Sequence, residues 1–237
     1  DLHGQLREEH VGKLLDLRTP DCLYLDSGDA IKAGNLAIPL RPEVAWERLA
    51  AGHCDLGTLG NRETHVQAAP FRAKLSGAQH PLLVANLRMK DSGEALDLPI
   101  ETHRIVEVGG IRLGVFGVMV PMVTERMATA ALSRYLWDDP IKSAHRMEAP
   151  LHHMVDLVIA ITHIGLKRDL ELAKSCPGIP LIFGGHSHSI LSQPERVGAT
   201  LIFQGGSHAR YVGCYDFDGS DLRRAELIPL TDPSPRG

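Results

Sequence analysis

The chain has 237 residues, 43% of them hydrophobic and 23% charged, with a formal net charge of −4 at pH 7. This composition is that of an ordinary globular domain with a substantial core. The mildly acidic balance disfavours a nucleic acid polymer as partner, and no apolar run approaches the ~20 residues that span a bilayer, so no membrane association is expected.

Apolar runs and helical periodicities alternate along the chain. The first part predicts, in order, a helix over 5–18, a strand over 22–25, a helix over 42–51, a strand over 55–59, a helix over 64–76 and a strand over 82–86. The second part predicts a hairpin of strands 102–108 and 111–118, a loop over a site at 119–137, helices over 140–154 and 166–175, and strands over 155–161, 181–183, 200–204 and 211–217. This alternation indicates an α/β fold.

The stretch 181–188 carries the first sign of chemistry. An apolar strand ends at Gly184-Gly185, and His186 and His188 follow. If the turn continues in extended form, the two imidazoles point the same way, because side chains repeat every two residues in a strand. Paired neutral imidazoles suggest a metal site. The alternative is a pair of polar turn residues.

The same pattern recurs elsewhere in the chain. An apolar strand is followed by glycine together with aspartate, asparagine or histidine at five places, which are Asp1/His3, Asp29, Asn61, His163 and His186/His188. Side chains delivered from the ends of several strands converge on one edge of a sheet. Oxygen and imidazole donors gathered there predict a metal site.

The four cysteines, Cys22, Cys54, Cys176 and Cys214, are dispersed, with no CxxC. In a chain of this size such cysteines are expected to be reduced rather than paired. That favours a cytoplasmic protein, and a secretion signal removed before residue 1 stays open as the alternative. The oligomeric state is left open.

Taken in order, these motifs resemble the calcineurin-like metallophosphoesterases, and within them the catalytic domain of the 5′-nucleotidase family. The resemblance rests on Asp1-Leu2-His3-Gly4, Gly28-Asp29, Leu59-Gly60-Asn61, Val84-Ala85-Asn86, Asp139-Pro140-Ile141, Thr162-His163-Ile164-Gly165 and Gly184-Gly185-His186-Ser187-His188. It implies a four-layer α/β/β/α sandwich with two mixed β-sheets. It also implies a single catalytic domain over 1–231, with its first strand before residue 1, a disordered tail over 232–237, and no C-terminal substrate domain.

The resemblance implies a site for two divalent metal ions. Asp1, His3, Asp29 and His188 would hold the first ion, and Asp29, Asn61, His163 and His186 the second. Donors of this kind, without thiolate, suit Mn, Zn, Fe or Co. The implied activity is hydrolysis of a phosphomonoester, for example a nucleotide, by in-line attack of a metal-bridging hydroxide, with a small-molecule phosphate ester as the partner. The alternatives are a cyclic-nucleotide or other phosphodiesterase and a degenerate, non-catalytic metal- or phosphate-binding domain.

Several residues depart from the family pattern. Arg62 stands where the family usually places a catalytic histidine, and His65 stands at the position of the aspartate that orients it. Arg62 can bind phosphate oxygens with its fork, and His65 could supply the acid; the alternative is a surface pair of Arg62 with Glu63. Catalytic roles are therefore expected for Arg62 and His65.

Three further expectations concern the surroundings of this site. Asn86 and His208 each follow a strand and are candidates for contact with the ligands or the substrate. Asp1 and His3 lie at the first residues of the sequence, with no preceding segment to hold them. A weak first metal site is expected if this is the natural start, and an intact one if it is only a boundary.

Overall fold

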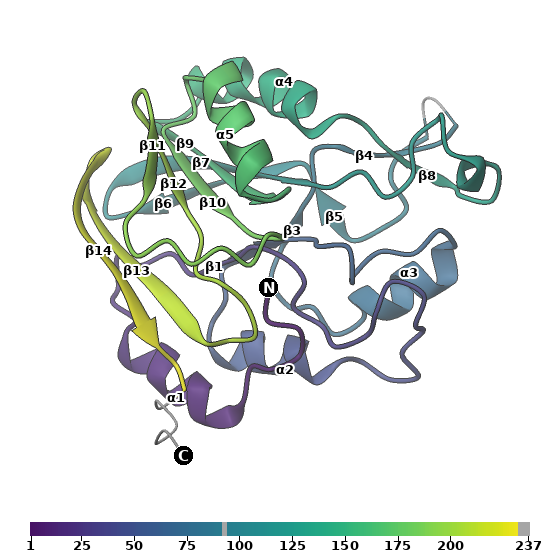
Figure 1. Cartoon of the computed structure of the whole chain (residues 1–237), viewed down its shortest axis with the longest axis horizontal. Helices are drawn as coiled ribbons and strands as arrows, with labels where there is room; N and C mark the ends of the chain where they lie inside the picture. The colour runs from purple at the N-terminus through teal and green to yellow at the C-terminus, as the bar shows by residue number, and fades with distance from the viewer. Residues whose placement is uncertain (92–93, 232–237) are drawn as a thin grey trace.

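The computed structural model of the chain describes residues 1–91 and 94–231. Two β-sheets pack face to face, and helices cover their outer faces, with α4 and α5 on one side and α1, α2 and α3 on the other (Figure 1). The helices are α1 (Glu8–Asp16), α2 (Val44–Ala51), α3 (Ala68–Leu75), α4 (Pro140–His152), α5 (Leu166–Ser175) and the 3₁₀ helix η1 (Ala128–Ala131). The predicted α/β/β/α architecture is confirmed.

The larger sheet has six strands in the order β11-β12-β10-β9-β7-β6. Its strands are β6 (His103–Val108), β7 (Ile111–Met119), β9 (Leu157–His163), β10 (Leu181–Gly184), β11 (Glu195–Val197) and β12 (Thr200–Phe203). The pairs β7–β9, β9–β10 and β10–β12 are parallel, while β6–β7 and β11–β12 are antiparallel. This sheet is mixed, as expected.

The smaller sheet has the order β1-β2-β3-β5, and its described pairings are all parallel, so it is not the second mixed sheet that was expected. Its strands are β1 (Leu25–Asp26), β2 (Leu56–Thr58), β3 (Leu82–Leu83) and β5 (Ile100–Glu101). Two antiparallel ribbons accompany the sheets, made of β4 (Leu87–Met89) with β8 (Tyr135–Trp137), and of β13 (Tyr211–Asp218) with β14 (Asp221–Pro229).

The alternation of side chains along β9 shows how the layers are held together. Ile159 and Ile161 point to the neighbouring sheet, where they pack in one cluster with Leu83 of β3. Val158 and Ala160 point the other way and pack with α4 and α5. A strand buried on both faces reads as a continuous apolar run, and that run made this strand recognisable in the sequence.

The segment 119–137 differs from its prediction as a loop. It contains η1 and ends in β8, whose side chains Tyr135, Leu136 and Trp137 are all buried. A strand of three residues that is covered on both faces gives no periodic signal, so the sequence pattern could not reveal it. The prediction for the tail 232–237 lies outside the described residues.

Two further expectations can be compared with the structure. All four cysteines lie among the described residues and are free, as predicted. No helix within the described ranges is long and apolar enough to cross a membrane.

Candidate metal centre

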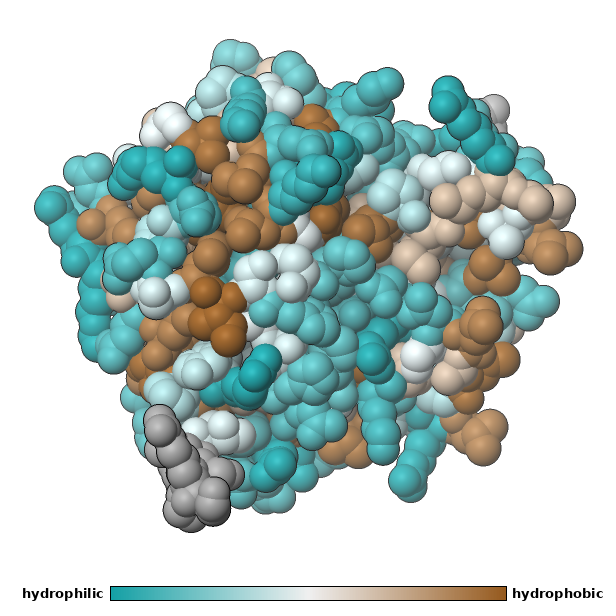
Figure 2. All heavy atoms as spheres, in the orientation of Figure 1, coloured by the Kyte–Doolittle hydropathy of each residue, from teal (hydrophilic) through white to brown (hydrophobic). Residues whose placement is uncertain are grey.

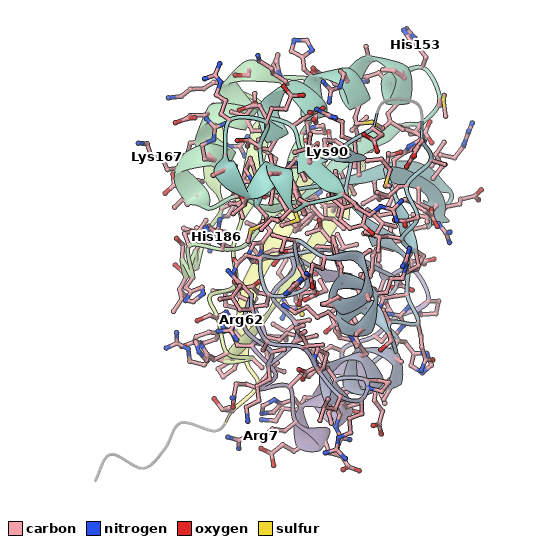
Figure 3. All side chains as sticks on the ribbon, turned by 90° about the vertical axis from the view of Figure 1, so that its right-hand side faces the viewer. Arg7, Arg62, Lys90, His153, Lys167 and His186 are labelled. Carbon is pink, nitrogen blue, oxygen red and sulfur yellow. The ribbon has the colours of Figure 1, made fainter. Side chains whose placement is uncertain are left out.

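The segments that follow β1, β2, β9, β10 and β12 meet beside residues 1–4, near the N-terminal end marked in Figure 1. These strands run parallel within their sheets, so their carboxyl ends lie at the same edge. Figure 3 shows Arg62, which follows β2, and His186, which follows β10, projecting on the same side of the molecule. The convergence predicted from the sequence is therefore present.

Four buried side chains form the centre of the cluster. Nε2 of His3 lies 3.6 Å from Oδ1 of Asp1 and 3.9 Å from Oδ2 of Asp29. Nε2 of His163 lies 3.6 Å from Oδ1 of Asp29. From the rim, Nε2 of His188 lies 3.5 Å from Oδ1 of Asp1. Two triplets of donor atoms are close enough to hold an ion, namely Asp1 with His3 and His188, and Asp1 with Asp29 and His163.

Several donor atoms of this cluster have no hydrogen-bond partner although they are buried. They are Oδ1 of Asp1, Nε2 of His3 and Nε2 of His163. A buried polar atom without a partner costs ~1–3 kcal/mol, and cations held by the two triplets would give Asp1 and His3 a partner in one triplet, and Asp1 and His163 a partner in the other. The residues present therefore fit a divalent metal ion.

His163 shows how the protonation needed for metal binding is arranged. Its side chain is fully buried, and its Nδ1 lies 2.7 Å from the backbone oxygen of Ser27. A carbonyl only accepts, so Nδ1 carries the hydrogen and the lone pair of Nε2 faces the cluster. Burial lowers the pKa of His163 to about 3, which keeps the ring neutral.

Asp1 and His3 are held in place by several backbone hydrogen bonds. The backbone nitrogen of Asp1 donates to the carbonyl of Gly28, and its Oδ2 accepts from the backbone nitrogen of His186 at 2.7 Å. The Asp1 carbonyl accepts from the backbone nitrogen of His208 at 2.7 Å, and His3 donates to the Asp29 carbonyl at 2.8 Å. The exposed fractions of Asp1 and His3 are only 8% and 9%.

Two glycines are required where the loops after β1 and β2 touch. A Cβ on Gly60 would lie 2.2 Å from Oδ1 of Asp29, and a Cβ on Gly28 would lie 2.5 Å from the backbone nitrogen of Gly60. Gly28 also has φ of +89°, in the left-handed region that other residues rarely adopt. The Gly-Asp and Gly-Asn pairs noticed in the sequence thus have a steric cause.

His186 and His188 reach the cluster differently from what was assumed. Their φ angles are +77° and +55°, so the turn is not extended. His186 places its ring 5.0 Å from that of His163, and His188 places its ring 4.9 Å from that of His3. The two imidazoles therefore face different parts of the cluster.

His208 and Asn86 have different surroundings. The ring of His208 stacks on that of His3 at 4.6 Å, which puts it within the cluster of imidazoles. Asn86 is buried and uses its amide for the backbone: Nδ2 donates to the carbonyls of Met119 and Asp138, and Oδ1 accepts from the nitrogen of Met119. These bonds favour a structural role for Asn86.

Arg62 lies beside the buried carboxylates. Its backbone nitrogen donates to Oδ1 of Asp29 at 2.8 Å, and its Nε lies 3.7 Å from Oδ2 of the same residue. Nη1 donates to the Lys32 carbonyl at 2.8 Å, and 28% of the side chain is exposed. Burial is the largest cause that lowers the pKa of His3, and the positive charge of the Arg62 guanidinium is the second. Arg62 is thus placed to meet an anion that approaches the cluster.

The neighbours of Arg62 in the sequence take other directions. Asn61 donates from Nδ2 to Oδ1 of Asn35 at 3.0 Å. Nδ1 of His65 accepts from the backbone nitrogen of Gln67, and among the described residues no hydrogen bond or ion pair links His65 to the buried carboxylates. Glu63 is fully buried.

Glu63 is an important residue that the sequence reasoning missed. Its carboxylate accepts from the backbone nitrogens of Asp29 at 3.0 Å, Ile31 at 3.1 Å and Gly60 at 2.8 Å. From the sequence alone, Glu63 is a candidate only for a surface pair with Arg62. Glutamate is rarely fully buried, so the sequence carried no signal for this position other than its place directly after Gly-Asn-Arg.

Comparisons with known proteins identify relatives of the chain. No family model matches the chain. It is 32% identical over 182 residues to an apyrase of Tabanus yao, covering 67% of this chain and 32% of that protein. It is 28% identical over 224 residues to the trifunctional nucleotide phosphoesterase protein YfkN of Bacillus subtilis, covering 86% of this chain and 15% of that protein. The chain thus spans a third or less of the length of these relatives.

Solved structures share the fold. The sulfate thiohydrolase SoxB of Thermus thermophilus superposes with a TM-score of 0.79 at 21% identity, covering 94% of this chain and 42% of that one. The calcineurin-like phosphoesterase YfkN of Bacillus subtilis superposes with a TM-score of 0.72 at 19% identity, covering 94% and 82%. Divalent metal ions are the cofactors of such proteins, in agreement with the donor triplets described above. The chain belongs to the calcineurin-like metallophosphoesterases, as a domain of the 5′-nucleotidase type.

Proposed function

We propose that this domain hydrolyses phosphomonoesters, with nucleotides as the main substrate class, and that it uses two divalent metal ions. The observation that carries the proposal is the set of buried, unpartnered atoms Oδ1 of Asp1, Nε2 of His3 and Nε2 of His163, which surround the carboxylate of Asp29. The names of the relatives, apyrase and nucleotide phosphoesterase, support nucleotides as the substrate class.

The proposed ligand sets follow the resemblance. Asp1, His3, Asp29 and His188 would hold the first ion, and Asp29, Asn61, His163 and His186 the second. Asp1 is a further donor within reach of the second ion, because its carboxylate lies close to Asp29 and His163. The oxygen and nitrogen donors favour Mn, Zn, Fe or Co.

Divalent ions in such a site supply positive charge that attracts a phosphate, and they lower the pKa of bound water. The residues of the chain provide the rest. Arg62 binds phosphate oxygens with its fork and stabilises the negative charge that develops during the reaction. His163 stays neutral because it is buried, and Ser27 fixes its orientation. Figure 2 shows the surface around the N-terminal end as mainly hydrophilic, which suits an ionic substrate.

We propose that His65 acts as a proton donor when its side chain turns toward the metal centre. In the structure its Nδ1 is engaged by the backbone of Gln67. Loss of a general acid reduces the rate by ~10²–10⁴-fold, so the proposed enzyme would favour substrates whose leaving group needs little protonation.

We propose that residues 1–231 form one catalytic domain. A cavity of about 580 Å³ lies between β1 and β13, and Asp1 and Leu2 line it. Its apolar lining, which includes Leu25, Phe203 and Phe217, fits the strand that the resemblance places ahead of residue 1. The resemblance assigns recognition of the base to a separate domain, so the phosphate is the part of the substrate that this domain is proposed to bind.

The test is hydrolysis by the purified protein with Mn²⁺, Zn²⁺, Fe²⁺ or Co²⁺ added in turn, measured as p-nitrophenol released from the two p-nitrophenyl esters and as phosphate released from adenosine monophosphate. The substrates are p-nitrophenyl phosphate, adenosine monophosphate and bis(p-nitrophenyl) phosphate. We expect metal-dependent hydrolysis of both monoesters, little hydrolysis of the bis-ester, and about two ions per chain by elemental analysis. Faster turnover of the bis-ester would favour a phosphodiesterase, and no turnover with any ion would favour a binding domain.

The variant Asp29→Asn tests the site itself. It keeps the size of the side chain but removes the charge that both proposed ion positions share. We expect loss of activity and of bound metal, whereas the exposed Asp221→Asn should behave like the unmodified protein. Unchanged turnover in Asp29→Asn would refute the bridging role.

A further inference from the structure

Lys74 is a fully buried lysine on α3, and its Nζ lies within a cage of backbone oxygens. It donates to the carbonyls of Gly34 at 2.8 Å, Asn35 at 3.0 Å, Arg62 at 2.7 Å and Thr64 at 2.9 Å. An ammonium group has three hydrogens, so these acceptors share them. Rings of carbonyls arranged in this way also bind bare monovalent cations.

The oxygens of the cage belong to two segments that border the metal centre. Asn35 lies in the loop after β1, and its Oδ1 accepts from Nδ2 of Asn61 at 3.0 Å. In the same loop the carbonyl of Lys32 accepts from Nη1 of Arg62 at 2.8 Å. Lys74 thus joins the loop after β1 to the turn after β2 from beneath, while Asn61 and Arg62 join them at the surface.

Glu63 complements Lys74 within the same turn. Its carboxylate binds backbone amides of the loop after β1 and of Gly60, whereas Lys74 binds backbone carbonyls. Burial lowers the pKa of Lys74 to about 8, and the nearby charges of Glu63 and Asp29 oppose that shift, so the lysine is charged at neutral pH. Burial also raises the pKa of Glu63, while its hydrogen bonds from the backbone amides of Ile31 and Gly60 favour the carboxylate. Glu63 and Lys74, each with several hydrogen bonds, thus bind the amides and the carbonyls of this backbone.

We propose that Lys74 is a positioning residue: a built-in cation that holds the turn carrying Asn61 and Arg62 against the loop that contains Asn35. The inference rests on the proposed function only in that Arg62 and Asn61 are assigned to the phosphate and the metal. A small cation that enters the cage after truncation of Lys74 would restore the arrangement.

Lys74→Ala tests this because alanine keeps the helix and leaves the carbonyl cage without its cation. Hydrogen exchange of the metal-free protein is measured by mass spectrometry in potassium, ammonium or choline chloride of equal ionic strength. We expect exchange in 32–36 and 60–65 to rise about 10- to 100-fold, the factor of one lost charged hydrogen bond. Potassium or ammonium should lower it again, and choline, which is too large for the cage, should not.

The control is Lys90→Ala, since Nζ of Lys90 donates to one carbonyl, that of Ala130, far from this turn in the sequence. It should leave exchange in 60–65 unchanged. Equal exchange in Lys74→Ala and the unmodified protein would overturn the proposal. So would a rise spread over β9 and β10 that no cation reverses, because that is the result of a merely structural lysine.

A second variant covers failure of Lys74→Ala to fold. Lys74→Gln keeps a hydrogen-bond donor but not the charge, and we expect faster exchange in 60–65 than in the unmodified protein; unchanged exchange would overturn the proposal. In the metal-loaded protein, Lys74→Ala should raise KM for p-nitrophenyl phosphate more than it lowers kcat, because Arg62 binds the anion. If no substrate is turned over, the proposed function fails while the exchange experiment still decides the role of Lys74.

Discussion

Asp169 offers a test of the buried network that supports the turn 185–188. This aspartate of α5 is fully buried; Thr162 donates from Oγ1 to its Oδ1 at 2.6 Å, and Gln204 donates from Nε2 to its Oδ2 at 2.8 Å. Oε1 of Gln204 in turn accepts from Oγ of Ser187, which lies between His186 and His188. The network therefore links the core to the turn that carries two proposed ligands.

Burial raises the pKa of Asp169 from 3.8 to about 7, because it outweighs the two hydrogen bonds that favour the charged form. The shift of about 3 pKa units corresponds to about 4 kcal/mol. The pKa is higher in the folded state. At a pH between the two pKa values, the native protein therefore keeps a proton on Asp169 that the unfolded chain has released. Stability from this group is complete below the unfolded pKa and falls as pH rises to about 7.

Asp169→Asn isolates this effect. Asparagine resembles the protonated acid: Nδ2 can donate to the Thr162 hydroxyl, which rotates to accept, while Oδ1 accepts from Gln204. We expect the free energy of unfolding of the unmodified protein, relative to Asp169→Asn, to fall by about 1.4 kcal/mol per pH unit between about pH 5 and pH 7.

The assay is urea unfolding followed by circular dichroism, in the presence of a chelator so that metal binding does not contribute. The exposed Asp221→Asn serves as the control and should show no such trend. Parallel pH profiles for Asp169→Asn and the unmodified protein would show that the carboxyl is charged throughout this range. The argument from burial would then be wrong.

Two further predictions concern the site and the packing of the sheets. Arg62→Ala should lower kcat/KM for a phosphomonoester by about 10- to 100-fold in steady-state kinetics, mainly by raising KM. Arg62→Lys should recover only part of the lost kcat/KM, because lysine lacks the forked guanidinium group. Unchanged kinetics in Arg62→Ala would place Arg62 outside the site. Gly117→Ala should destabilise the fold by more than about 3 kcal/mol in urea unfolding, because its Cβ would lie 1.8 Å from the carbonyl oxygen of Leu83, whereas Gly34→Ala, with nothing within 4 Å, should be tolerated. A soluble, equally stable Gly117→Ala would mean that β3 and β7 do not approach so closely.

The sequence predicted those elements whose burial produces a regular pattern. The strand β9 begins with an unbroken apolar run from Leu157 to Ile161, α5 begins and ends at the predicted residues, and β6 and β7 form the predicted hairpin with Val108 opposite Ile111. By contrast β14 mixes exposed and half-buried residues without strict alternation and contains four charged residues, so its sequence carries no clear strand signal. Its pairing with β13 comes from tertiary contacts that a local pattern does not contain.

The type and order of side chains in the sequence predicted most of the candidate site. Residues of a charged type that are buried in the fold could not be predicted in this way. Aspartate, asparagine and histidine after strand ends led to the cluster around Asp29. Glu63 and Lys74 could not be found in the same way, because charged residues are rarely buried and a local pattern gives no reason to bury these two. Their partners are backbone groups of distant segments, which become visible only when the loops after β1 and β2 lie together.

The backbone of the site explains why those buried groups matter. Among the described residues, non-glycine positions with positive φ include His3, Asp29, His186, His188 and His208, with φ between 53° and 77°. Each costs about 1–2 kcal/mol, so the conformations persist only because surrounding contacts enforce them. Glu63 binds the backbone nitrogen of Asp29, and Oδ2 of Asp1 binds that of His186. The strained positions and the unpartnered donor atoms lie in the same cluster, and His3 belongs to both sets, so the free energy that a bound cation returns is available to offset both.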